Sequence, residues 1–152
     1  MIQAELIQLA RDTAKAHNLF PEIVCAIAEQ ESSWAPFAMR YEPAFYEHYI
    51  MPLVNKGEVK RETEARARAV SWGLGQVMGQ LARELGFKGK FLSELCDPLV
   101  GLEYLCRALN QKLGFASGNM EKALLFYNGG GNPNYPTEVL ARVEKYKSQE
   151  AT

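Results

Sequence analysis

Apolar residues recur every three to four positions along most of the chain, which is the spacing of one face of an α-helix. The first such face predicts a helix from Ile2 to about His17. The second begins at Pro21, a residue that suits the first helical turn. Its apolar positions are Ile23, Val24, Ile27 and Ala28. Both helices are expected to bury these faces in a common core.

The remaining segments also favour helices, separated by prolines and glycines. Short or solvated helices are predicted over 44–50, 60–69, 76–85 and 91–95. Asp97 and Pro98 form a helix start, with the aspartate as cap, and the apolar stripe that follows marks the central core helix. Two more helices are predicted, from Asn119 to Gly129 and over 136–147. The fold class is therefore all-α, with Ser71–Gly75 as a turn and a minor β-hairpin left open between Arg40 and Lys60.

Composition limits the kind of protein further. The chain has 152 residues, of which 47% are hydrophobic and 23% charged, so residues 1–152 are assigned to one globular domain. The net charge of −1 gives no basic excess for binding nucleic acid. No apolar run reaches the roughly 20 residues of a membrane span, and the first residues lack the pattern of a signal peptide. We expect a monomer that is made in the cytoplasm, or a chain trimmed from something longer, with no nucleic acid or membrane partner.

The cysteines and histidines do not have the spacing of a metal site. Cys25, Cys96 and Cys106 are far apart and odd in number, and His17 and His48 are also well separated. Buried free thiols are the preferred interpretation, with a disulfide or redox role as the alternative. We therefore expect no metal and no cofactor.

Glu31 interrupts the apolar face of the second helix, one turn beyond Ile27 and two beyond Ile23. A carboxylate that points at a core loses hydration, and its pKa rises. A raised pKa is what a general acid needs to hold its proton near neutral pH. The alternative is that Glu31 marks the frayed end of the helix and reaches water.

Four short motifs follow one another in the order found in lytic transglycosylases. They are Glu31-Ser32-Ser33-Trp34-Ala35-Pro36, Gly73-Leu74-Gly75-Gln76-Val77-Met78, Leu95-x-Asp97-Pro98 with Gly101-x-x-Tyr104-Leu105, and Ala123-Leu124-x-x-Tyr127-Asn128-Gly129-Gly130. With these four motifs, the chain resembles the SLT domain of the lytic transglycosylase and goose-type lysozyme-like superfamily. The resemblance implies an all-α, lysozyme-like fold with a substrate cleft that cleaves peptidoglycan.

The segment between the first two motifs departs from the transglycosylase pattern. A long insertion replaces the compact Ser-x-x-Gly-Ala, and Val70-Ser71-Trp72 stands where Gly-Ala-x is expected. The run Ser71-Trp72-Gly73-x-x-Gln76-x-Met78-Gly79 is more similar to phage endolysin N-acetylmuramidases, as is Arg40-Tyr41-Glu42-Pro43-x-Phe45-Tyr46. These two segments favour hydrolysis over transglycosylation.

The resemblance implies that Glu31 protonates the leaving oxygen of a β-1,4 glycosidic bond. In an inverting hydrolase a second carboxylate activates water. Glu42, among aromatic residues, is the candidate, and an ion pair with Arg40 or a lysine is the alternative. In transglycosylation the muramyl 6-hydroxyl attacks instead, so no second carboxylate is needed.

Five residues are predicted to bind substrate: Ser71, Tyr46, Gln76, Tyr127 and Asn128. Gln76 is expected near the acid, either orienting it or binding an acetamido group, unless it is only a polar residue at a helix start. The hydroxyl of Tyr127 is expected against Glu31 or the sugar, while its ring packs in the core. Asn128 is expected to tie the cleft floor to the backbone, or simply to end a helix.

The expected function is therefore that of a muramidase acting on bacterial peptidoglycan glycan strands, with a lytic transglycosylase as the alternative. A catalytically silent wall-binding or virion-structural domain of the same fold is the non-enzyme alternative. Retention of Glu31 favours an enzyme. Because the chain shows no signal peptide, it is expected to act on the wall after release or export.

Overall fold

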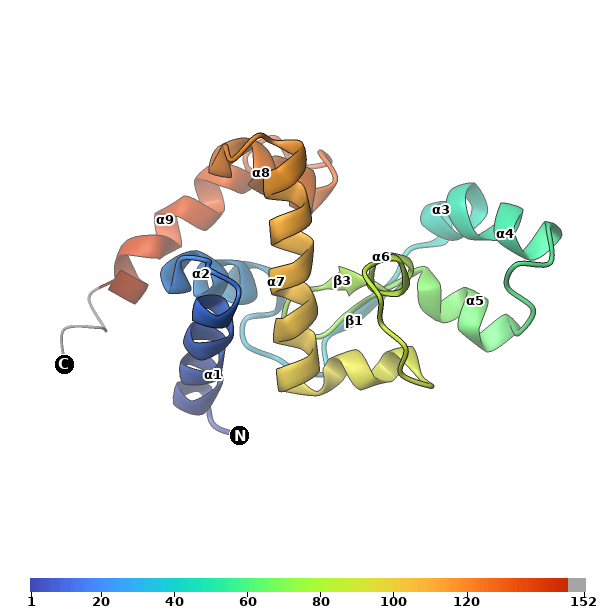
Figure 1. Cartoon of the computed structure of the whole chain (residues 1–152), viewed down its shortest axis with the longest axis horizontal. Helices are drawn as coiled ribbons and strands as arrows, with labels where there is room; N and C mark the ends of the chain where they lie inside the picture. Colours follow the sequence, from blue (N-terminus) through green and yellow to red (C-terminus); the bar gives the residue numbers. More distant parts are fainter. Residues whose placement is uncertain (148–152) are drawn as a thin grey trace.

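The computed structural model describes residues 1–147, and most of them are helical. Five helices form a main lobe, in which α7 runs as a central column with the first two helices on one side and the strands on the other (Figure 1). They are α1 (Gln3–Ala16), α2 (Pro21–Ser32), α7 (Pro98–Phe115), α8 (Met120–Asn128) and α9 (Tyr135–Lys147). Each of the corresponding helices predicted from the sequence is confirmed.

Helix α7 forms where the sequence predicted a helix start. The Asp97 side chain accepts hydrogen bonds from the backbone N–H groups of Leu99 and Val100, and Pro98 occupies the first turn. The apolar stripe behind this cap is fully buried and includes Leu102, Leu105, Cys106 and Leu109. These side chains pack with the buried faces of α1, α2, α8 and α9, so α7 is the centre of the main core.

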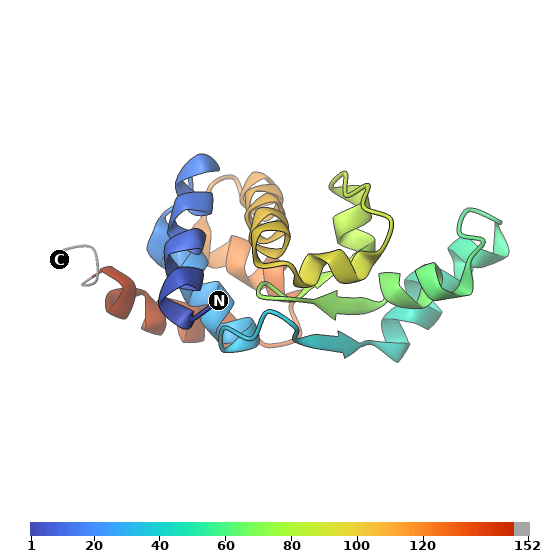
Figure 2. The ribbon, with the colours of Figure 1, turned by 90° about the horizontal axis from the view of Figure 1, so that it is seen from below.

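Three short strands form an antiparallel sheet in the order β1-β2-β3. The strands are β1 (Met39–Tyr41), β2 (Val70–Trp72) and β3 (Val77–Met78). Figure 2 shows β1 and β2 lying antiparallel between the main lobe and a second group of helices. Arg40 pairs with Ser71, which in turn pairs with Met78.

The sheet corrects two predictions. The minor hairpin lies at 70–78 rather than between Arg40 and Lys60, because β1 pairs with a strand about thirty residues downstream. Ser71–Gly75 is strand followed by turn, and the helix predicted over 76–85 begins only at α6 (Gly79–Glu84). Pairing between distant segments decides these strands, and no local pattern reveals it.

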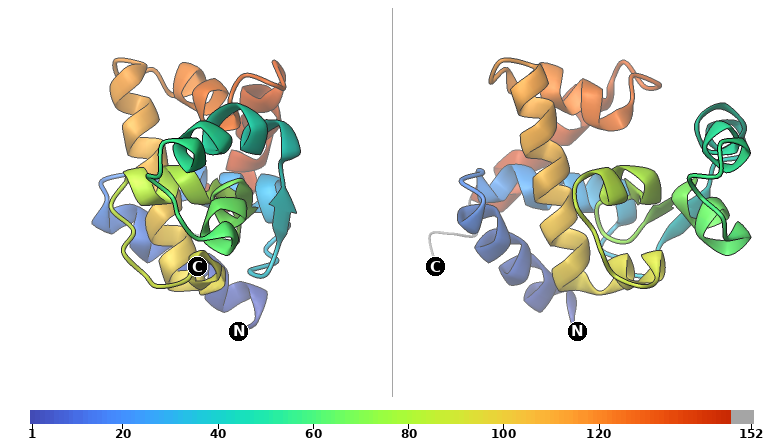
Figure 3. Two further views of the ribbon diagram at one scale, coloured as in Figure 1. Left: turned by 90° about the vertical axis from the view of Figure 1, so that its right-hand side faces the viewer. Right: turned by 45° about the vertical axis from the view of Figure 1, so that its right-hand side comes forward.

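Residues 43–68 form an arm that stands to one side of the central column, clearest in the second view of Figure 3. The arm consists of α3 (Pro43–Phe45), the π-helical turn η1 (Tyr46–Ile50), α4 (Met51–Asn55) and α5 (Glu62–Arg68). Helices were predicted over 44–50 and 60–69, and both are confirmed. The arm has a small buried cluster, made of Tyr46, Ile50, Val59 and Ala65 together with Ala69, the residue that follows the arm.

A third cluster lies beneath the sheet and joins it to the main lobe. It contains Trp72 and Val77 from the strands together with Leu92 and Leu95 of the 3-10 helix η2 (Leu92–Cys96). The sequence predicted a short helical turn at this place, which is confirmed. This packing holds the sheet in place against η2.

All three cysteines are free thiols, as the sequence indicated. Cys25 and Cys106 are fully buried in the main core, whereas Cys96 is partly exposed. Burial raises the pKa of the Cys106 thiol to about 12, so it stays protonated. Among residues 1–147, no helix is long and apolar enough to cross a membrane.

Candidate active site

Glu31 lies in the last turn of α2, where the chain leaves the main lobe for the sheet. The helix stops because Ser33 and Trp34 both adopt left-handed backbone angles, with φ of 49° and 64°. Two consecutive non-glycine residues in this region store strain, which surrounding contacts must offset. Trp34 supplies one such contact, since its indole N–H donates to the Tyr146 hydroxyl at 3.0 Å in the core.

Tyr135 holds the carboxylate of Glu31. Its hydroxyl donates a hydrogen bond of 2.7 Å to Glu31 Oε1, and its side chain is only 2% exposed at the start of α9. The Tyr135 ring stacks on that of Tyr127, with centroids 6.5 Å apart and planes 12° from parallel. Tyr135 was not among the predicted site residues. The only local signal for it in the sequence is an aromatic residue at the start of a helix that closely follows the fourth motif.

The surroundings of Glu31 favour its protonated form. Burial raises the pKa of the carboxyl above its ordinary value, while the Tyr135 hydrogen bond and the Arg40 charge act to lower it. Burial is the largest of these effects, so the pKa is raised. The expectation of a raised pKa is confirmed, and the frayed helix end is not what the structure shows.

Glu31 opens onto a cavity of about 460 Å³, here called the acid cavity. The five residues predicted to bind substrate include four that line it: Ser71, Gln76, Tyr127 and Asn128. The acid cavity continues into an arm cavity of about 680 Å³, since Arg40, Glu42, Met78, Tyr127 and Asn128 line both. The two together form a groove that crosses the sheet and runs between the arm and α8.

Glu42 lies in this groove but is already paired. Arg40 Nε donates to Glu42 Oε1 at 2.6 Å, which is the ion pair that the sequence analysis kept as an alternative. The charge that acts on Glu31 is that of Arg40, and it lowers the pKa of the Glu31 carboxyl.

Ser71 and Gln76 bond to each other and to the backbone. Ser71 Oγ donates to Gln76 Oε1 at 2.9 Å, and Gln76 Nε2 donates to the carbonyls of Ala38 and Gly73, both at 3.0 Å. Gln76 lies in the turn between β2 and β3 with φ of 48°, so its prediction as a residue at a helix start is wrong. Its amide braces the wall of the acid cavity and does not orient Glu31.

Tyr127 and Asn128 also form hydrogen bonds with backbone groups around the groove. The Tyr127 hydroxyl donates to the Gly75 carbonyl at 2.7 Å, so the predicted contact with Glu31 is made by Tyr135 instead. Asn128 Oδ1 accepts from the N–H of Asn132 at 2.9 Å and shapes the turn after α8. Its role in tying the cleft to the backbone stays a prediction.

Tyr46 is not in the groove. Its ring is 8% exposed within the arm's cluster, and the Arg66 guanidinium covers it at 4.0 Å from the centroid. Tyr46 therefore does not line the groove, and its role in binding substrate stays a prediction. Its neighbours Phe45 and Tyr49 line the arm cavity instead.

The part of the chain that the structure describes contains no group of three or more His, Cys, Asp or Glu residues arranged to hold a metal ion. Within residues 1–147, the wall of the groove carries one half-buried carboxyl with a raised pKa, that of Glu31. Such a group can donate a proton to substrate oxygen and take one back.

The chain matches one family model, described as "Transglycosylase SLT domain", over residues 8–149. Comparisons with curated proteins and with solved structures give no match. The matched region includes Glu31, the sheet, the arm and Tyr135. It therefore covers every residue of the groove described above.

Proposed function

The chain belongs to the transglycosylase SLT domain family, so it degrades peptidoglycan on a lysozyme-like, all-α fold, and we propose that Glu31 is its general acid. The observation that carries the proposal is the geometry at the end of α2. The Glu31 carboxyl, whose pKa is raised, lines the acid cavity there, and the Tyr135 hydroxyl donates a hydrogen bond of 2.7 Å to it. The bond cleaved is the β-1,4 bond between N-acetylmuramic acid and N-acetylglucosamine.

In the proposed reaction, protonated Glu31 gives its proton to the leaving glycosidic oxygen as the bond breaks. Positive charge develops on the sugar carbon and ring oxygen, and the ionised Glu31 then faces this oxocarbenium-like centre. The nucleophile attacks that carbon and returns a proton to Glu31. The Tyr135 hydrogen bond stabilises the carboxylate between these two steps.

The finer choice is between an intramolecular hydroxyl and a water molecule as nucleophile. We propose the 6-hydroxyl of the muramyl unit, which gives a 1,6-anhydro end, because this route needs only one carboxyl. The Arg40–Glu42 ion pair supports this route. Glu42 is the candidate base for hydrolysis, and one of its carboxylate oxygens already accepts a hydrogen bond from Arg40. Hydrolysis by a muramidase is the second candidate, favoured by the place of Glu42 in both cavities.

Replacement of Glu31 by glutamine tests the general acid. The Glu31→Gln variant keeps the side-chain volume but cannot protonate the leaving oxygen, so release of soluble fragments from peptidoglycan should fall at least about a hundredfold. Glu22→Gln, in the first turn of the same helix, is the matched control and should retain activity. Near-normal cleavage by a folded Glu31→Gln protein would show that Glu31 is not the acid.

Product mass and the Glu42→Gln variant together distinguish the two nucleophiles. Transglycosylation should yield muramyl ends one water lighter than hydrolysis does, and Glu42→Gln should then cost little activity. Fragments with reducing ends, combined with a Glu42→Gln variant slowed by about a hundredfold or more, would establish Glu42 as the base of a hydrolase. That result would favour the muramidase predicted from the endolysin-like segments.

A further inference from the structure

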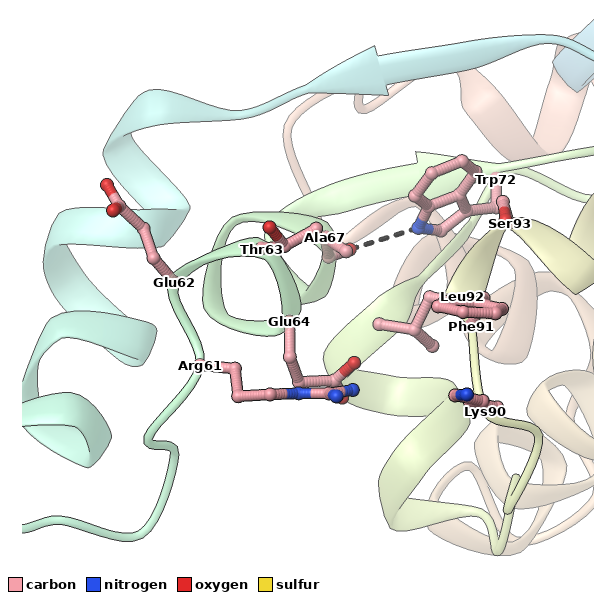
Figure 4. Close-up of a pocket in the computed structure, with 10 residues that line it drawn as sticks. All are labelled: Arg61, Glu62, Thr63, Glu64, Ala67, Trp72, Lys90, Phe91, Leu92 and Ser93. Carbon is pink, nitrogen blue, oxygen red and sulfur yellow. Dashed lines mark hydrogen bonds between the residues drawn. The ribbon is translucent and has the colours of Figure 1, made fainter.

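A second cavity, of about 430 Å³, lies away from Glu31 between α5, β2 and the start of η2 (Figure 4). We call it the outer cavity. Its size is close to that of the acid cavity and falls in the range of small-molecule sites. It is lined by Arg61, Glu62, Thr63, Glu64, Ala67, Trp72, Lys90, Phe91, Leu92 and Ser93. None of these residues lines the groove described above.

The alternating direction of side chains along strand β2 places the two sites on opposite faces of the sheet. Ser71 lines the acid cavity, and the next residue, Trp72, lines the outer cavity, because successive side chains of a strand point to opposite faces. Cross-strand partners follow the same division: Met78 lies in the groove beside Ser71, while Val77 packs with Trp72 beneath the sheet. One strand therefore carries both sites, on opposite faces.

The walls of the outer cavity are preformed. Arg83 of α6 donates to both carboxylate oxygens of Glu64, a lining residue on α5, at 2.7 and 3.1 Å. The same guanidinium donates to the carbonyls of Phe87 and Gly89, at 3.0 and 2.7 Å, just before the lining segment that begins at Lys90. The Trp72 indole N–H donates to the Ala67 carbonyl at 3.0 Å, as Figure 4 shows. These bonds fix the wall positions, so little ordering is needed to bind a ligand.

The charge that remains available at the cavity is positive. Glu64 is neutralised by Arg83 and Arg68, and Glu62 points away from the other side chains in Figure 4. Within residues 1–147, Arg61 and Lys90 have no acidic partner. The Lys90 ammonium lies 5.3 Å from the centroid of Phe91, whose ring is 54% exposed at the rim.

We propose that the outer cavity is a second, non-catalytic binding site for peptidoglycan, which takes a sugar ring on Phe91 and an adjacent carboxylate between Arg61 and Lys90. The ligand follows from charge complementarity, because muramyl units and their stem peptides carry carboxylates, and from the amphipathic character of a sugar ring. This inference rests on the proposed function, since the same polymer occupies both sites.

Two sites on one molecule change how the enzyme binds an insoluble polymer. Occupation of the outer cavity holds the protein on the wall after each cut, and the local concentration of strands at the groove stays high. Short soluble glycans cannot reach both sites. The outer cavity should therefore matter for whole peptidoglycan and not for small fragments.

The test uses the inactive Glu31→Gln protein, so that binding is measured without digestion. Its affinity for insoluble peptidoglycan, stripped of phosphate-containing polymers, is measured by co-sedimentation. Adding Arg61→Gln and Lys90→Gln should weaken binding by at least about tenfold. Lys15→Gln with Lys122→Gln removes the same charge from α1 and α8, and should leave binding unchanged.

Activity on two substrates completes the experiment. With Glu31 intact, the Arg61→Gln, Lys90→Gln protein should cleave short soluble glycans normally but digest whole peptidoglycan more slowly. Binding equal to that of the control pair would overturn the proposal. So would a loss seen only on walls that retain their phosphate polymers, which would identify those polymers as the ligand. If instead no variant with Glu31 intact cleaves any glycan while the binding loss persists, the proposed function fails and the site stands.

Discussion

At the scale of single residues, the groove is organised by one carboxyl and one hydroxyl that lie far apart in the sequence. Glu31 was predictable because it takes an apolar position on a regular helical face. Tyr135 was not predictable, since its contact with Glu31 depends on how α9 packs against α2. Sequence patterns identify which side chain is buried but not which distant side chain it meets.

The hydrogen bond from Tyr135 should set the basic limit of activity. As the proposed general acid, Glu31 must be protonated to act, so the rate should fall as pH rises through its raised pKa. Tyr135→Phe removes a contact that lowers this pKa, and the pKa of Glu31 should rise further. The basic limb of the pH–rate profile should therefore shift to higher pH, while turnover drops by about tenfold to a hundredfold through lost orientation.

Tyr146→Phe is the matched control for this variant. Tyr146 lies on the same helix and is as deeply buried, but its hydroxyl accepts from Trp34 and does not contact Glu31. The control should lose some stability and keep the basic limb of the wild type. A limb that moves to lower pH in Tyr135→Phe would contradict the role assigned to this hydrogen bond.

At the scale of elements, the sheet and its turn position the groove wall. Helices were readable from the sequence because their periodicity extends over many residues. The strands span two or three residues each, too few for alternation to be recognised. Gln76 was misplaced for this reason, and the helix predicted at 76 begins three residues later at Gly79.

Gly73 fixes the turn between β2 and β3. It has φ of +69°, and a Cβ added there would overlap the Leu95 carbonyl oxygen of η2. Gly73→Ala should cost about 1–2 kcal/mol for the left-handed backbone and about 1–3 kcal/mol more for the overlap. Chemical denaturation measures this loss in the free energy of unfolding.

Gly57→Ala separates the two causes. Gly57 has a similar φ of +76°, but nothing lies within 4 Å of an added Cβ. Only the backbone cost should remain, so the control should be clearly more stable than Gly73→Ala. Equal losses in the two variants would mean that the approach of η2 to the turn does not constrain the groove wall.

At the scale of the whole molecule, three buried clusters follow one another from the main lobe through the sheet to the arm. The main cluster draws on five helices, whereas that of the arm contains Tyr46, Ile50, Val59, Ala65 and Ala69. The sequence indicated a single core because apolar periodicity does not show which stripes meet. Since the arm cluster is small, the arm should open at lower free energy than the main lobe.

Ile50→Ala tests this hierarchy. Ile50 is fully buried in the arm, and its truncation should cost about 2–5 kcal/mol of local stability. Amide exchange should accelerate over residues 43–68 and stay slow in α7 (Pro98–Phe115). Leu105→Ala, equally buried in the main core, should instead accelerate exchange throughout the molecule. Acceleration of α7 by Ile50→Ala would indicate that arm and lobe unfold as one unit.

The packing of α9 on α2 has a consequence for the time at which the protein becomes active. A ribosome completes the acid-bearing helix early, but the tyrosine that holds the acid emerges 104 residues later. Arg142 and Lys145, which pair with Glu29 on the same helix, follow later still. A nascent chain therefore carries an unsupported acid for most of its synthesis. If Glu31 is the acid, as proposed, catalytic competence arrives with α9, after the residues of the groove, the sheet and the arm have been synthesised.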